Sequence, residues 1–137
     1  MDKKYCSFFH KEKDKEVNVT FPDFPGCVAA GNDFKEALKS AQEALEFHIE
    51  GMVLEDYDIP EPKDINELID IAKECEENPQ IVWLSVEIPE RKVQRVNITM
   101  PEYALKKIDS YLSTHKNLKN RSNFLVEAAS DYIHKHA

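Results

Sequence analysis

Arg95, Asn97 and Thr99 are the side chains whose types and spacing best suit recognition chemistry. They alternate along residues 92–100, so in an extended backbone they project from one face. An arginine can form two hydrogen bonds to guanine, an asparagine can form two to adenine, and a threonine methyl group can contact thymine. This face therefore predicts the reading of base edges in DNA.

A second group of polar residues follows at the start of the last helical pattern in the chain. The free N–H groups at a helix start suit a phosphate. We expect the residues of this turn to bind DNA phosphate; they are Asn120, Arg121, Ser122 and Asn123.

The elements that would position these residues are a strand and two helices. Val96, Ile98 and Met100 form the apolar face of the strand, and Pro101 suits the first position of a helix that we expect to run to about His115. A second helix follows, with Asn120 or Ser122 as its N-cap.

One strand and two short helices bury too little apolar surface to stand alone, and a lone strand leaves its backbone hydrogen bonds unpaired. We therefore expect a homodimer paired through residues 93–100. The sequence leaves open whether dimers associate further into tetramers.

The strand-helix-helix pattern of residues 92–137 resembles the ribbon-helix-helix family of DNA-binding proteins. The resemblance implies that paired strands enter the major groove, that Arg95, Asn97 and Thr99 face the bases, and that the turn at 120–123 holds phosphate. A solvated strand beside some other helical hairpin is the alternative.

Charge divides the chain at the same place. The 137 residues carry 18 basic and 26 acidic side chains, net −8. Residues 91–137 hold nine Lys/Arg and four Asp/Glu, net +5, which leaves −13 for residues 1–90. This asymmetry predicts two domains, 1–90 and 91–137, with the basic one facing a polyanion.

Residues 1–90 show strand patterns at 5–10, 16–21, 27–30 and 81–88, with a charged hairpin turn at 11–15. Asp33, with Glu36 three positions later, favours the start of a long amphipathic helix. Asp64 with Glu67 favours a further helix that ends before Pro79. The fold class expected for the whole chain is α+β.

The run Phe-Pro-Asp-Phe-Pro-Gly-Cys at 21–27, with the helix that follows and the Pro60–Pro62 exit, resembles the HicB antitoxin family. The resemblance covers about Tyr5 to Lys63. It implies a small β-β-β-α-β domain, a reduced ribonuclease H-like fold, that masks a HicA-like ribonuclease toxin. The residues that contact the toxin cannot be read from the sequence.

Catalysis is not expected, nor is a cofactor. A ribonuclease H site needs several carboxylates around two metal ions, and the strand pattern at 5–10 contains no acid. The five histidines and Cys6, Cys27 and Cys75 show no metal-ligand spacing. We expect reduced, mostly buried cysteines, no membrane span and a cytoplasmic protein.

The sequence therefore favours an antitoxin of a type II toxin-antitoxin system that blocks a HicA-like mRNA-cleaving toxin and represses its own operon by binding operator DNA. A ribbon-helix-helix regulator with a ligand-sensing or protein-sensing front domain is the alternative. A residual metal-dependent nuclease is the third hypothesis.

Overall fold

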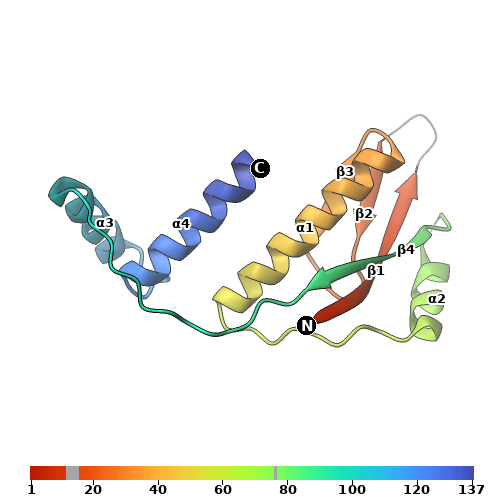
Figure 1. Cartoon of the computed structure of the whole chain (residues 1–137). Coiled ribbons are helices and arrows are strands. Elements are labelled where there is room, and N and C mark those ends of the chain that lie inside the picture. The colour runs from red at the N-terminus through yellow and green to blue at the C-terminus, as the bar shows by residue number, and fades with distance from the viewer. Residues whose placement is uncertain (12–15, 76) are drawn as a thin grey trace. The chain divides into compact units, whose positions relative to one another are not determined.

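The computed structural model describes residues 1–11, 16–75 and 77–137, and these divide into two compact units, Met1–Glu90 and Arg91–Ala137 (Figure 1). Each unit is considered by itself. Most of the hairpin turn expected at 11–15 lies outside the described residues.

The first unit is built on a four-stranded antiparallel sheet in the order β3-β2-β1-β4. The strands are β1 (Asp2–Lys11), β2 (Val17–Thr20), β3 (Val28–Gly31) and β4 (Gln80–Glu87). Each expected strand of this unit is confirmed to within three residues at either end, and the last strand pairs with the first, which leaves β4 at one edge of the sheet.

The helix α1 (Phe34–Leu54) covers one face of this sheet. It buries Ala37, Ala41, Leu45 and Ile49 at helical spacing, and these meet a core that includes Tyr5, Phe9, Val17, Val19, Leu84 and Val86. The expected start is confirmed, because the Asp33 carboxylate accepts a hydrogen bond of 2.8 Å from the Glu36 N–H.

Two glycines allow the chain to enter α1. Gly26 has a φ of +90°, a conformation that favours glycine, in the turn between β2 and β3. Gly31 lies against the first turn of α1, where an added Cβ would stand 2.3 Å from the Ala37 nitrogen. Only the absence of a side chain at Gly31 lets β3 and α1 approach this closely.

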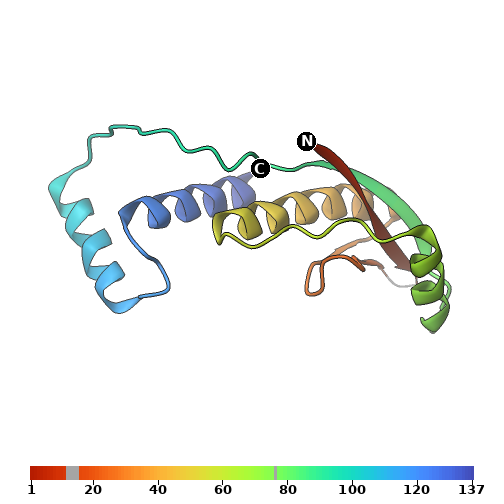
Figure 2. The same ribbon diagram turned by 90° about the horizontal axis from the view of Figure 1, so that it is seen from below.

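The helix α2 (Ile65–Glu74) packs on the opposite face of the sheet. Its buried residue is Leu68, which contacts the side chains of Cys6 and Phe8 in a second, smaller cluster. Figures 1 and 2 show the chain between α1 and α2 running along the unit to reach this position. The helix is confirmed and Asp64 is its N-cap, but the Asp64 side chain makes no capping hydrogen bond.

The second unit contains α3 (Glu102–Thr114) and α4 (Arg121–His136). Both expected helices are confirmed, and Asn120 is the N-cap of α4. Pro101 is the N-cap of α3, one position before the first helical position expected for it. Residues 88–101 form neither helix nor strand in the single chain. A strand needs a partner to complete its hydrogen bonds, so the pairing expected through residues 93–100 stays a prediction about the dimer.

Candidate functional site

The residues expected to read DNA lie on an exposed arm, residues 91–100. Arg95, Asn97 and Thr99 are all exposed, and so are the apolar side chains between them, Val96 at 76% and Ile98 at 63%. Exposed apolar side chains that lie next to one another are typical of interaction surfaces. The arm therefore carries a polar series and an apolar series, and both are exposed in the part of the chain that the structure describes.

The helical hairpin that follows the arm has no buried residue in either α3 or α4. The two helices contact each other where the ring of Tyr111 packs against that of Phe124, with 5.7 Å between the ring centroids. Leu105, Ile108 and Leu112 of α3 are half-buried. Tyr132 and Ile133 of α4 remain 65% and 67% exposed. Two helices with no buried side chain lack the apolar burial that stabilises a domain.

The turn before α4 has a defined geometry. The Asn120 side chain accepts a hydrogen bond of 2.9 Å from the Asn123 N–H. Arg121 donates two hydrogen bonds to Asp109 of α3, from Nε to Oδ1 at 2.8 Å and from Nη2 to Oδ2 at 2.7 Å. These hydrogen bonds, with the attraction of the guanidinium, lower the pKa of Asp109.

This geometry divides the four residues expected to bind phosphate. Asn120 already caps the helix, and Arg121 already pairs with Asp109, which ties the start of α4 to α3. Ser122 is exposed at the first turn, where backbone N–H groups suit an anion. Phosphate binding at 120–123 stays a prediction, and sequence reasoning missed Asp109 because nothing in the pattern couples it to Arg121.

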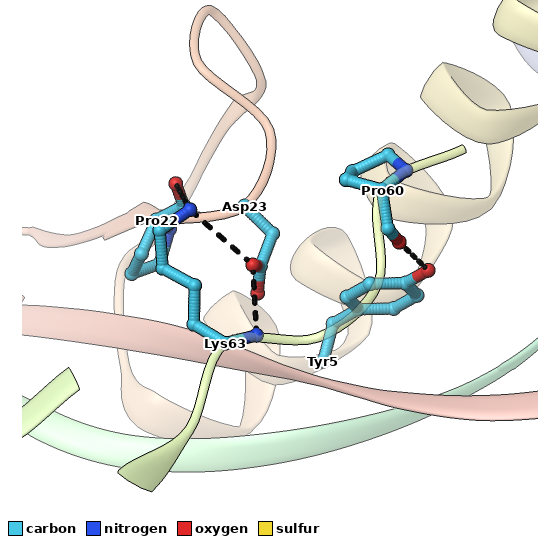
Figure 3. Close-up of polar contacts among 5 residues, drawn as sticks. All are labelled: Tyr5, Pro22, Asp23, Pro60 and Lys63. Atoms are coloured by element: carbon cyan, nitrogen blue, oxygen red, sulfur yellow. Dashed lines mark hydrogen bonds and ion pairs between the residues drawn. The ribbon is translucent and has the colours of Figure 1, made fainter. Parts of the chain in front are cut away.

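In the first unit, the distinctive 21–27 turn holds the segment that leaves α1 (Figure 3). The Tyr5 hydroxyl donates a 2.6 Å hydrogen bond to the Pro60 carbonyl. Asp23 Oδ1 accepts a 3.1 Å hydrogen bond from the Lys63 N–H and lies 3.5 Å from Lys63 Nζ. These contacts fix the path of the chain from α1 to α2.

Burial changes the titration of several groups near this core. Desolvation, with the charges of Glu61 and Asp23, raises the pKa of Tyr5 to about 12. Burial also raises the pKa values of Cys6 and Cys27 to about 11. The two thiols are free and buried, as expected, and thiols protonated at neutral pH are unreactive.

A groove of about 640 Å³ runs between α1 and the edge strand β4. Lys39 and Gln42 of α1 line one side, and Trp83 of β4, 43% exposed, lines the other. Gln42 donates a 2.8 Å hydrogen bond to the Ser85 carbonyl and so covers part of the strand edge. Trp83 has this exposure because β4 is an edge strand of the sheet.

Among the described residues, no group of three or more His, Cys, Asp or Glu side chains is placed to hold a metal ion. Within the same residues, no helix is long and apolar enough to cross a membrane.

The chain thus consists of an α+β unit and a second unit with an exposed, alternating arm and a helical hairpin. Comparison with known proteins specifies the class. Residues 5–129 match the family described as HicB-like antitoxin of bacterial toxin-antitoxin system. This match covers most of the chain, including α2, and the protein therefore belongs to the HicB-like antitoxin family.

Individual relatives agree with the family match. The crystal structure of the Burkholderia pseudomallei antitoxin HicB is 26% identical, covers 98% of both chains and superposes with a TM-score of 0.63. The antitoxin HicB3 crystal structure is 34% identical over 96% of this chain and 98% of its own, with a TM-score of 0.55. A 14.9 kDa protein from the rep-hol intergenic region of Haemophilus phage HP1 is 37% identical over 84% of this chain and 86% of its own length.

Proposed function

We propose that the unit Met1–Glu90 binds and inhibits a HicA-like, mRNA-cleaving toxin, and that the unit Arg91–Ala137 binds operator DNA as a homodimer and represses the operon that encodes both proteins. Membership of the antitoxin family carries this proposal. We also propose that the first unit has a reduced ribonuclease H-like fold, that the protein is cytoplasmic and that it has no catalytic activity.

The dimer is supported by what the second unit leaves exposed. Val96 and Ile98 are largely exposed in the single chain. Pairing two arms antiparallel would pack these side chains against the helices α3 and α4 of the dimer. The same pairing would satisfy the backbone groups of both arms. We propose that residues 93–100 form this two-stranded ribbon.

The DNA contact is supported by charge and by side-chain type. Residues 91–137 carry a net charge of +5, which favours a polyanion. In a two-stranded ribbon, Arg95, Asn97 and Thr99 would share the face opposite Val96 and Ile98 and could enter the major groove. The turn at 120–123 would then meet the phosphate backbone.

The toxin contact is supported by the charge of the first unit. Residues 1–90 carry −13, and a protein that binds and cleaves RNA must present positive charge to it. Opposite charges steer two such partners together and increase the rate of association.

The test uses the full chain with the product of the adjacent small reading frame. RNA cleavage by that product should stop when the full chain is added in equal amount, and the two should elute together on size exclusion. Binding of the full chain to DNA upstream of its own operon is measured by fluorescence anisotropy at several salt concentrations.

Arg95→Ala and Asn97→Ala should each weaken operator binding by about 1 to 3 kcal/mol for each base that the side chain no longer reads, and both should leave toxin inhibition unchanged. Unchanged operator affinity in both variants would disprove the reading face. A neighbour that neither binds the chain nor cuts RNA would disprove the antitoxin role and favour a DNA-binding regulator with a sensing front unit.

A further inference from the structure

The helix α2 is anchored to the sheet on one side and left open on the other. Leu68 is fully buried against Cys6 and Phe8. Ile65 and Ile69, one turn apart, remain 42% and 39% exposed. Two isoleucines at i and i+4 form a continuous apolar strip on a helix, and more than a third of each of these two residues is open to solvent.

The outward side of α2 carries a row of carboxylates. At about 100° per residue, Glu67, Asp70 and Glu74 fall within an arc of about 60° on the helix, and all three are exposed. Residues 64–77 hold six acidic side chains and one basic side chain, Lys73. This short stretch contributes −5 to the charge of the first unit.

These carboxylates are not compensated within the described part of the chain. No ion pair joins Glu67, Asp70 or Glu74 to a cation there. Like charges at i and i+4, as at Asp70 and Glu74, disfavour a helix. On α1, by contrast, Lys39 precedes Glu43 by four positions, a spacing that lets opposite charges attract.

The exposed side of α2 carries an apolar strip on one flank and a row of carboxylates on the other. This arrangement corresponds to the apolar core and polar rim of a protein interface. The negative charge of this surface determines which kind of partner it can bind. Nucleic acid is repelled by this surface, and so is a second copy of the first unit, which carries −13. A cationic protein surface with an apolar patch is complementary to it.

We propose that the outward side of α2, formed by Ile65, Ile69, Glu67, Asp70 and Glu74, is the surface that binds the cationic face of the toxin. This inference rests on the proposed function and adds the location of the toxin contact. The buried Leu68 fixes the helix on the sheet, and the carboxylates replace the phosphates that the toxin would otherwise bind in RNA.

The experiment measures the affinity of the full chain for the product of the adjacent small reading frame by isothermal titration calorimetry. One variant removes three charges from α2, Glu67→Gln with Asp70→Asn and Glu74→Gln. A second removes the apolar strip, Ile65→Ser with Ile69→Ser. The matched control removes three charges from α1, Glu43→Gln with Glu46→Gln and Glu50→Gln. Thermal melting of each variant shows whether the first unit is still folded.

We expect each α2 variant to raise the Kd about tenfold or more at about 0.1 M salt, and the α1 control to raise it less than about threefold. The charge variant should also reduce the dependence of the Kd on salt. Wild-type affinity in the folded charge variant, or an equal loss in the α1 control, would overturn the surface while the proposed function stands. A wild-type chain that does not bind the neighbour would overturn both.

Discussion

His48 shows how a single residue of α1 couples the first unit to pH. The ring of His48 packs edge-on against Phe24, with 5.7 Å between the ring centroids. Desolvation by burial lowers the pKa of His48 below its ordinary value of 6.5. The folded chain therefore holds this histidine neutral at a pH at which the unfolded chain already protonates it.

The stability contributed by His48 depends on pH. Because the unfolded chain takes up the proton first, the contribution of His48 is fully present above about pH 6.5 and is lost as the pH falls below it. We expect the first unit to lose stability between pH 7 and pH 5 relative to His48→Phe, which keeps an aromatic ring but cannot titrate. Urea unfolding of both proteins at each pH measures this difference; parallel curves would show that His48 does not contribute.

At the scale of residues, the sequence predicted side-chain contacts between positions close in the chain and missed contacts between distant positions. The pairing of Asp33 with the Glu36 N–H spans three positions and was predicted, because capping signatures are local. The pairing of Arg121 with Asp109 spans twelve positions and depends on how α3 meets α4. The contact of Asp23 with Lys63, forty positions apart, was likewise out of reach of any periodicity.

The two acidic N-caps of the first unit offer a matched test at the scale of the element. Asp33 accepts a hydrogen bond from a backbone N–H in the first turn of α1, whereas the Asp64 side chain makes no such capping hydrogen bond at α2. We expect Asp33→Ala to lower the free energy of unfolding by about 1 kcal/mol. Asp64→Ala should cost only the few tenths that a carboxylate contributes near a helix N-terminus.

Urea denaturation of both variants, followed by far-UV circular dichroism, measures the two costs under one set of conditions. Equal losses in the two variants would contradict the assignment of a capping hydrogen bond to Asp33 alone.

The glycines at the two ends of α1 provide a second matched pair. An added Cβ at Gly31 would collide with the backbone of Ala37, whereas one at Gly51 would meet nothing within 4 Å. Gly31→Ala should therefore destabilise the first unit by about 1 to 3 kcal/mol, the usual cost of overpacking. Gly51→Ala should stabilise it by about 0.5 to 1 kcal/mol, since alanine favours the helix.

Melting temperatures of the two alanine variants at one protein concentration test this opposition of signs. A Gly31→Ala protein as stable as the wild type would mean that β3 can move away from α1. That outcome would remove the close approach as the reason for glycine at this position.

At the scale of the molecule, the front unit was predicted more completely than the back one. Strands 5–10, 16–21 and 81–88 alternate or run apolar because their faces are buried within one chain. Residues 92–100 alternate just as clearly, yet they form no strand in the single chain. Periodicity indicates which face of a strand becomes buried. It does not show whether the residues that bury this face belong to the same chain.

The two faces of the arm allow dimerisation and DNA binding to be tested separately. Ile98 is 63% exposed on the arm. In a paired ribbon it would lie on the apolar face, between the two strands and the helices of the dimer. Ile98→Asp would place a carboxylate in that apolar contact, where an unpaired charge is costly, so we expect a monomeric chain with a disordered second unit. Asn97→Ala, one position away on the other face, should leave the dimer intact and weaken only operator binding.

Sedimentation equilibrium gives the mass of each variant, and fluorescence anisotropy gives its operator affinity. The first unit should melt normally in both, because it has its own core of buried residues. A dimeric Ile98→Asp protein would place the dimer contact outside residues 93–100 and leave the arm free. A monomeric Asn97→Ala protein would show that the functions of the two faces are reversed. The side chains assigned to DNA would then be the ones that hold the dimer together.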